Sequence, residues 1–235
     1  MNQFKNPIIS VKDLYFNYEN NLVLNNVSFN IPKGSRCAII GPNGAGKTTL
    51  MKCLIGLEKF KHGKINIYEN EKNNITYVPQ RKFVDWTFPI TVYEVVLMGA
   101  YDIFNFWNFS IPKEAHKKTE EVLKLMNLYD LRNNHINDLS GGQQQRVFIS
   151  RALAQNGNIY LMDEPLTGLD RNSELLIFNI FKFIQNQNKT IVAVHHDWKT
   201  AKEYFDWAIL LNKEVIYFGP TEIDNFENLL QKTFE

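Results

Sequence analysis

The sequence predicts an α/β fold built on a mostly parallel sheet, with a helical insertion in the middle of the chain. Residues 36–40 (RCAII) form a continuous apolar run, which is typical of a strand buried on both faces. A glycine-rich loop and a helix-like stretch follow this run directly. From residue 159 onward, further apolar runs alternate with a helical pattern, which favours a parallel sheet with its ligand chemistry at the carboxyl ends of the strands.

On either side of the glycine-rich loop, the pattern indicates strands. Residues 8–18 and 26–31 alternate apolar and polar side chains, as strands with one buried face do. Residues 64–68 and 75–78 are further candidate strands, and the polar residues 69–74 predict a turn between them.

Between residues 80 and 138 the pattern changes from strands to helices. Residues 91–99 and 113–128 have helical periodicity and predict a helical insertion, and a helix over residues 143–154 follows. The α/β pattern then resumes, with strands expected at residues 159–165, 190–197, 208–212 and 215–219 and a helix at residues 173–185. A chain of 235 residues can hold one core with an inserted subdomain, since domains average about 150 residues.

The composition is that of a soluble globular protein, with 44% hydrophobic and 22% charged residues. The formal net charge is only +1, which does not suggest a basic face, so we do not expect nucleic acid as a partner. No stretch reaches the roughly 20 apolar residues of a membrane span, and residues 1–10 lack a signal-peptide pattern, so a membrane role would need another chain. Cys37 and Cys53 have no CxxC spacing, which favours buried thiols in a reducing cytosol.

The glycine-rich loop has the spacing of a phosphate-binding motif. Residues 41–48 (GPNGAGKT) fit G-x-x-x-x-G-K-[ST] between a buried strand and a helix, although a turn that merely joins strand to helix is the alternative. Lys47 adds a charge at the β- and γ-phosphates of a nucleotide, and the Thr48 hydroxyl is a ligand for Mg²⁺. The predicted nucleotide-binding residues are Gly41, Pro42, Asn43, Gly44, Ala45, Gly46, Lys47, Thr48 and Thr49.

An acidic pair follows the apolar run at residues 159–162. Asp163 would stand beside the Mg²⁺, and Glu164, just past the strand end, can polarise an attacking water. The alternative is an acidic pair that only caps a strand before Pro165.

Other polar and aromatic side chains complete the candidate site. Gln80 can reach the Mg²⁺ or the water with a neutral amide and report γ-phosphate occupancy to the helical insertion. Either His195 or His196, at the end of a predicted strand, can donate to the γ-phosphate, while a structural role is the alternative. Tyr18 can stack on the adenine ring or simply pack at the surface.

Residues 139–143 (LSGGQ) form a second candidate phosphate site at the start of a predicted helix. The Ser140 hydroxyl, nearby N–H groups and the helix dipole can bind a phosphate without a lysine. Since the loop around Lys47 would hold the ATP of its own chain, this second phosphate site should face the ATP of another copy. A two-fold, head-to-tail dimer would place each ATP between the Lys47 loop of one copy and the LSGGQ segment of the other. The predicted residues of this half-site are Ser140, Gly141, Gly142 and Gln143.

These motifs, in this order and at this spacing, resemble those of the ATP-binding cassette (ABC) ATPases. The matches are Tyr18, the P-loop, Gln80, LSGGQ, residues 159–165 (IYLMDEP), the GLD that ends at Asp170, and His196, which directly precedes Asp197 as the family requires. Thr48 stands where many members have serine.

The resemblance implies a RecA-like P-loop core, about residues 1–80 and 155–235, with an antiparallel β-subdomain. An inserted helical subdomain would span about residues 81–154. The resemblance also implies Mg²⁺-dependent ATP hydrolysis by a dimer that drives partner subunits. The implied catalytic residues are Lys47, Gln80, Glu164 and His196, and the implied Mg²⁺ ligands are Thr48, Gln80 and Asp163.

Residues 77–99 resemble the corresponding segment of ABC importers for manganese and related transition metals. In such importers this surface receives a permease helix, so Trp86, Phe88 and Pro89 are socket candidates, with packing of the helical subdomain as the alternative. The resemblance implies a peripheral protein on the cytoplasmic side of the membrane and a manganese cargo, with zinc or iron as alternatives. A soluble ABC ATPase without a permease, as in iron-sulfur assembly, and an ATP-dependent clamp are the competing functions.

Overall fold

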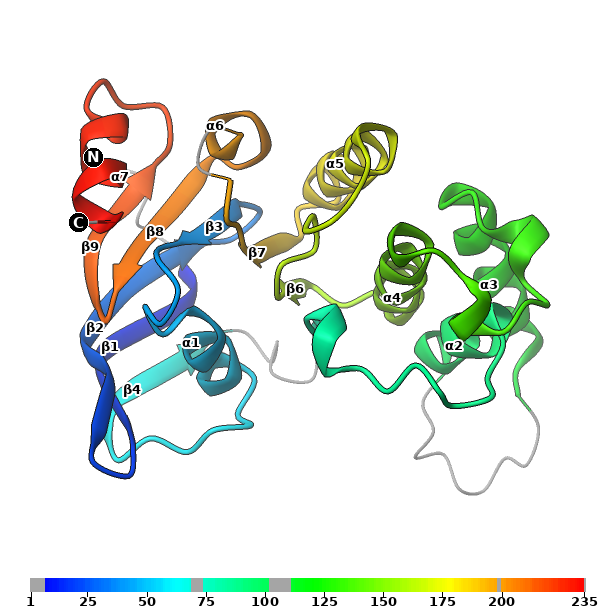
Figure 1. Ribbon diagram of the computed structural model, residues 1–235, viewed down its shortest axis with the longest axis horizontal. Coiled ribbons are helices and arrows are strands. Elements are labelled where there is room, and N and C mark those ends of the chain that lie inside the picture. The colour runs from blue at the N-terminus through cyan, green and yellow to red at the C-terminus, as the bar shows by residue number, and fades with distance from the viewer. Residues whose placement is uncertain (1–6, 69–73, 102–110, 198–199, 235) are drawn as a thin grey trace.

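The computed structural model describes residues 7–68, 74–101, 111–197 and 200–234 (Figure 1). Most of the turn predicted over residues 69–74, and residues 1–6 of the amino-terminal stretch, lie outside these ranges. Among the described residues, no helix combines the length and the apolar character that crossing a membrane requires.

A six-stranded sheet in the order β5-β6-β7-β3-β8-β9 organises the described chain. Its neighbouring strands are parallel from β5 to β8, and only β9 runs antiparallel to its neighbour. The strands are β3 (Arg36–Ile40), β5 (Ile75–Val78), β6 (Ile159–Met162), β7 (Thr190–Val194), β8 (Trp207–Asn212) and β9 (Glu214–Pro220). The predicted α/β fold with a mostly parallel sheet is therefore confirmed.

The central strand β3 is buried on both faces, as its continuous apolar run predicts. Cys37 and Ile39 belong to one hydrophobic cluster, which also contains the first helix, α1 (Lys47–Leu54). Ala38 and Ile40 point into a second cluster on the other face of the sheet. Because successive side chains of a strand face opposite sides, β3 joins the two cores and fixes the position of the loop that follows it.

A second, three-stranded antiparallel sheet in the order β2-β1-β4 packs against α1 through the first of these clusters. Its strands are β1 (Pro7–Tyr18), β2 (Asn21–Pro32) and β4 (His62–Ile67). Strand β2 begins earlier than the predicted residue 26, because it forms a hairpin in which Tyr18 pairs with Asn21. The three consecutive apolar residues 22–24 break the alternation that identifies the rest of the strand.

The helical insertion lies between β5 and β6 in the chain, and α2 packs on α4 within it. Its main helices are α2 (Val92–Ala100), α3 (Lys113–Leu125) and α4 (Gly141–Gln155), with short 3₁₀ turns η2 (Arg81–Phe83), η3 (Tyr129–Leu131) and η4 (Ile136–Asp138). A capping box between Thr91 and Glu94 starts α2. All three predicted helices of this region are confirmed, whereas the subdomain limits of about 81 and 154 stay a prediction.

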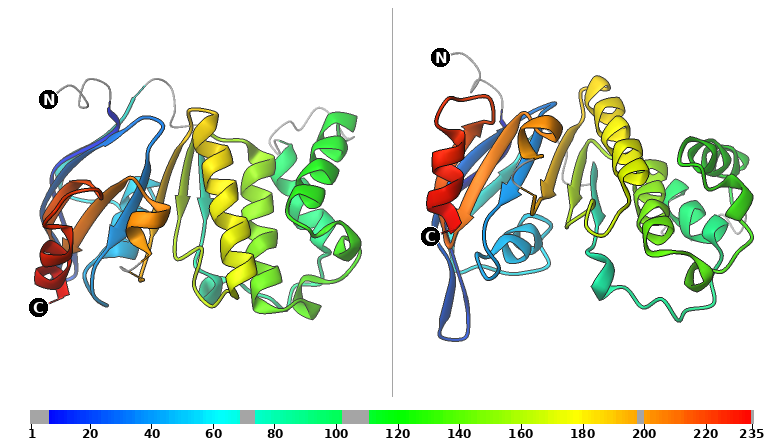
Figure 2. Two further views of the ribbon diagram at one scale, coloured as in Figure 1. Left: turned by 90° about the horizontal axis from the view of Figure 1, so that it is seen from above. Right: turned by 45° about the horizontal axis from the view of Figure 1, so that its top comes forward.

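Among the described residues after β6 there are three helices, of which the sequence pattern predicts the first, and the four-residue α6 is too short for a periodic pattern to predict. They are α5 (Arg171–Asn186), α6 (Ala201–Tyr204) and α7 (Phe226–Phe234). Figure 2 shows α5 and α4 side by side, with α3 beyond α4. Helix α7 lies at the end of the molecule opposite α2 and α3 (Figure 1).

Candidate functional site

The loop between β3 and α1 depends on glycine at positions where a side chain would collide. A Cβ atom on Gly41 would clash with the carbonyl oxygen of Leu211. Gly46 has a φ of 92°, a left-handed conformation that glycine adopts without strain, and it directly precedes α1. The backbone of the loop therefore packs closely against β8 and β2.

Lys47 is nearly buried at the start of α1, with 6% of its surface exposed. Its Nζ donates to the carbonyl oxygens of Gly41 at 2.8 Å and Pro42 at 2.7 Å. Burial lowers the pKa of the ammonium group, and the negative charges of Glu164 and Asp163 raise it back toward its ordinary value. The cation is thus held inside the loop and near two carboxylates.

Asp163 directly follows the buried strand β6 and is itself fully buried. Burial raises the pKa of its carboxyl group, and the Thr48 hydroxyl offsets part of that rise. Neither carboxylate oxygen makes a full hydrogen bond with any described residue. A fully buried carboxylate that lacks a well-formed hydrogen bond fits a cation ligand, because a bound divalent ion would compensate its charge.

Glu164 and His196 meet at the carboxyl ends of two neighbouring strands. Nε2 of His196, just after β7, lies 2.6 Å from Oε1 of Glu164, just after β6. Glu164 has a φ of 55°, which is uncommon for a residue with a side chain and often marks functional sites. Both strands end before these residues, earlier than the sequence predicts, so the polar side chains leave the sheet.

His195 takes a different position from its neighbour. Only 5% of its surface is exposed, and its Nε2 shares a hydrogen bond of 2.9 Å with the Thr200 hydroxyl. Burial lowers the pKa of the His195 imidazole, which favours its neutral form. The local sequence pattern alone does not decide whether His195 or His196 donates to the γ-phosphate. In the structure His196 is the histidine beside Glu164.

Gln80 follows β5 at the same edge of the sheet. Val78 pairs with Met162 in the parallel register, so Gln80 and Glu164 each follow their paired strands by two residues. Gln80 is 9% exposed and precedes the turn η2. Lys82, in that turn, lowers the pKa of Asp163 through its charge, and the sequence reasoning missed it although it lies two residues after Gln80.

Tyr18 lies at the tip of the β1–β2 hairpin, with 42% of its surface exposed. Its hydroxyl donates to Oε1 of Glu58 at 2.8 Å, and its ring meets the Phe16 ring edge-on with centroids 4.8 Å apart. These two contacts hold the exposed ring in place at the tip of the hairpin.

The LSGGQ segment caps helix α4. The Ser140 hydroxyl accepts from the backbone N–H of Gln143 at 3.3 Å, and the side-chain oxygen of Gln143 accepts from the N–H of Ser140 at 2.8 Å. A Cβ atom on Gly142 would lie 3.9 Å from Oδ2 of Asp170, so the start of α4 lies against the start of α5. Helices α1 and α4 lie well apart in both figures, so one chain does not bring its LSGGQ to its own P-loop (Figures 1 and 2).

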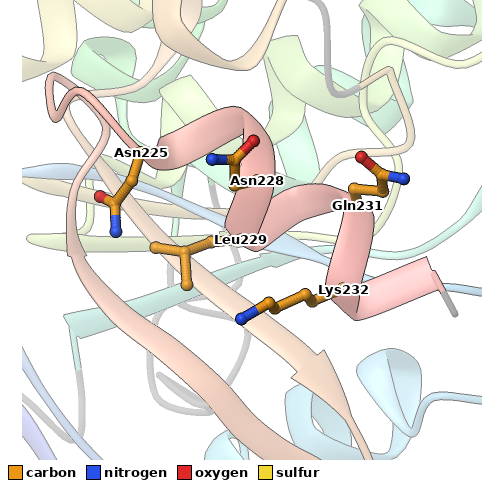
Figure 3. A pocket seen from close by; sticks show the side chains of 5 residues that line it. All are labelled: Asn225, Asn228, Leu229, Gln231 and Lys232. Carbon is orange, nitrogen blue, oxygen red and sulfur yellow. The ribbon is translucent and has the colours of Figure 1, made fainter.

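A hollow of about 380 Å³ lies along α7 (Figure 3). It is lined by Asn225, Asn228, Leu229, Gln231 and Lys232. None of them is a predicted site residue, so the candidate site rests on the motif residues at the sheet edge and not on this hollow.

Known proteins resemble this chain over most of its length. A family model described as ABC transporter matches residues 24–167, more than half of the chain. The manganese transport system ATP-binding protein of Bacillus subtilis is 44% identical over 92% of this chain and 88% of its own length. The zinc transport system ATP-binding protein of Treponema pallidum is 40% identical over 96% of this chain and 86% of its own length.

A solved structure has the same fold. A dimeric bacterial ABC transporter cassette superposes with a TM-score of 0.78 at 30% identity, over 92% of this chain and 99% of that one. The mixed sheets, the inserted helices and the P-loop described above are thus those of an ATP-binding cassette. The chain therefore belongs to the ABC transporter family, as one of its ATP-hydrolysing cassettes.

Proposed function

We propose that the chain is the motor subunit of an ABC importer for manganese or a related transition metal, bound to the cytoplasmic side of a membrane. The assignment as an ATP-hydrolysing motor rests on one observation. Lys47, Asp163 and the Glu164–His196 pair lie together at one edge of the sheet. The cargo rests on the relatives, whose names specify manganese and zinc transport. Manganese is the first choice, with zinc or iron as alternatives.

The nucleotide would bind along the P-loop. Lys47 would exchange its two loop carbonyl partners for the β- and γ-phosphate oxygens, which are stronger partners because the bonds are charge-assisted. Thr48, Asp163 and Gln80 would hold Mg²⁺, and the buried carboxylate of Asp163 supports this assignment. Bound there, the ion would neutralise phosphate charge. Tyr18 would stack on the adenine.

Hydrolysis would use Glu164 as the base for the attacking water. The contact between Nε2 of His196 and Oε1 of Glu164 orients the carboxylate, while the same ring can turn to donate to the γ-phosphate. Lys47 would stabilise the charge on the transferred phosphoryl group. A clamp that binds ATP without turnover would need none of these groups to be poised for proton transfer.

The catalytic pocket would be completed by a second copy of the chain. Each ATP would lie between the P-loop of one copy and Ser140, Gly141, Gly142 and Gln143 of the other. The separation of α1 from α4 within one chain supports this arrangement, as does the dimeric state of the related cassette. A two-fold axis would make both pockets identical.

Ser140→Arg is expected to leave ATP binding by the monomer intact and to block dimerisation driven by ATP. The long, positively charged side chain would occupy the space between the two copies. The loss of the N-cap would cost only about 1 kcal/mol of helix stability. Sedimentation with and without ATP measures the effect. Ser140→Thr, which keeps the capping hydroxyl, is the matched control. A Ser140→Arg chain that still dimerises with ATP would contradict the two-copy pocket.

The permease would contact the surface around Trp86 and Phe88. The Phe88 side chain is 61% exposed and free to enter an interface. The Trp86 ring instead packs edge-on against Phe148, with centroids 5.3 Å apart, and its Nε1 donates to the Arg81 carbonyl oxygen at 3.1 Å. Packing therefore explains part of the role of Trp86, and Phe88 offers the cleaner test.

Phe88→Ala is expected to lower metal uptake by the assembled transporter several-fold while basal ATP hydrolysis by the isolated chain stays unchanged. Removing an apolar anchor weakens an interface without touching the nucleotide site. Uptake of radioactive manganese and phosphate release measure the two activities. Phe234→Ala, at an exposed ring on α7, is the control. Unimpaired uptake by Phe88→Ala would remove this residue from the permease contact.

Co-purification tests the importer itself against a soluble ABC ATPase. Detergent extracts of the native membrane should yield this chain together with an integral subunit. If extraction repeatedly yields the chain without any integral subunit, the importer assignment fails and the soluble function replaces it.

A further inference from the structure

The side chain of Arg81 spans from the segment after Gln80 to the first turn of α4. Its Nε donates to Oε1 of Gln144 at 2.9 Å. Its Nη1 lies 2.6 Å, and its Cζ 2.9 Å, from the position that a Cβ atom of Gly141 would occupy. The guanidinium group therefore lies directly on the first residue of the helix, in space that any other residue at position 141 would fill.

Gln144 receives this contact in a fixed orientation. Only 4% of its surface is exposed, and its Nε2 donates to the Ile136 carbonyl oxygen at 3.1 Å. The amide therefore presents its oxygen to Arg81 and cannot turn over without leaving both partners poorly matched. Movement of Arg81 must then move α4 or break a charge-assisted hydrogen bond.

Arg81 also contacts Trp86, near the proposed permease surface. Its carbonyl oxygen accepts from Nε1 of Trp86, and its guanidinium carbon lies 5.7 Å from the centre of the Trp86 ring. Trp86 in turn packs against Phe148 of α4. One residue thus contacts both the start of α4 and the ring that packs one to two turns further along the same helix.

Arg81 places a positive charge at the amino-terminal end of α4. A cation at the amino-terminal end of a helix is unfavourable, because the helix dipole is positive there. Arg81 is nevertheless placed against Gly141 by specific contacts with Gln144 and Trp86, although it is exposed enough to extend into solvent. A position that is held against an electrostatic cost indicates a function for the contact itself.

We propose that Arg81 is the positioning residue that couples Gln80 to the LSGGQ end of α4. When Gln80 shifts on engaging the nucleotide, Arg81 carries that shift through Gln144 and orients Ser140–Gly142 for the ATP of the second copy. The coupling acts on dimerisation and leaves the P-loop of the same chain untouched. This role rests on the proposed ATP-dependent dimer.

The test measures two binding steps in a Glu164→Gln background that prevents turnover. ATP affinity of the monomer is measured by calorimetry at low protein concentration, and dimerisation with ATP by sedimentation. The variants are Arg81→Ala, Arg81→Lys, Gln144→Ala and the Arg81→Ala/Gln144→Ala pair. Arg151→Ala removes an exposed positive charge from the far end of α4 and is the matched control. Monomer ATP binding also shows that each variant is folded.

Arg81→Ala is expected to weaken dimerisation roughly tenfold and to change monomer ATP affinity less than twofold, since one hydrogen bond to a charged group is lost. Gln144→Ala should weaken dimerisation similarly. The double variant should dimerise as well as Arg81→Ala alone, because both substitutions remove the same contact. Arg81→Lys should also dimerise weakly, because lysine keeps the charge but cannot reproduce the Nε donor geometry.

Three results would overturn the coupling role. They are normal dimerisation of Arg81→Ala, full additivity of the two substitutions, and recovery of dimerisation by Arg81→Lys, which would assign the effect to charge alone. Failure of the Glu164→Gln parent itself to dimerise with ATP would instead refute the proposed dimer, and the coupling with it.

Discussion

Replacement of Lys47 by alanine is expected to weaken ATP binding by the monomer by roughly 30-fold to a few thousand-fold. Removing one partner of a buried, charged contact costs about 2–5 kcal/mol, and each 1.4 kcal/mol is a factor of ten in affinity. In this chain the ammonium group is almost fully buried and already directed at the loop carbonyls of Gly41 and Pro42. Calorimetric titration with ATP measures the change.

Lys52→Ala is the matched control for Lys47→Ala, because Lys52 lies in the last turn of the same helix. Its removal should leave the ATP affinity within about twofold of the parent, since the side chain lies at the opposite end of α1 from the phosphate-binding loop. If Lys47→Ala binds ATP as tightly as the control, the P-loop does not hold the phosphates in the proposed way.

Glu164→Gln is expected to slow ATP hydrolysis by about 10² to 10⁴ while ATP binding persists. A positioned general base contributes that factor, and glutamine keeps the shape and the contact with His196 but cannot accept the proton of the water. Steady-state phosphate release measures turnover, and calorimetry measures binding. Glu121→Gln, at an exposed position on α3, should leave both unchanged.

Unchanged turnover in Glu164→Gln would refute the assignment of Glu164 as the base. A parent chain that binds ATP and dimerises, but releases no phosphate even with its partners present, would instead identify the protein as a clamp.

The sequence predicts the centre of the fold well because the local signals there agree. The apolar run at residues 36–40, the glycine loop and Lys47 together leave few alternatives to a strand, a phosphate loop and a helix, and the structure has this order. The helices around residues 91–154 are predictable because their helical periodicity is regular.

The remaining features depend on contacts between distant residues. The alternation rule misses the start of β2 because its pairing with β1, and not its own pattern, makes it a strand. The choice between His195 and His196 cannot be made from local pattern, because it depends on Thr200 on one side and Glu164 on the other. Only the structure shows the contact of Arg81 with Gly141, which crosses from one strand end to a helix start.

The structure of the Glu164→Gln chain, trapped with ATP and Mg²⁺, tests the central claim most directly. The account predicts a two-fold dimer in which each γ-phosphate lies between Lys47 of one copy and Ser140 and Gly142 of the second copy. Separate chains that hold ATP in their own P-loops, with residues 140–142 facing solvent, would contradict it.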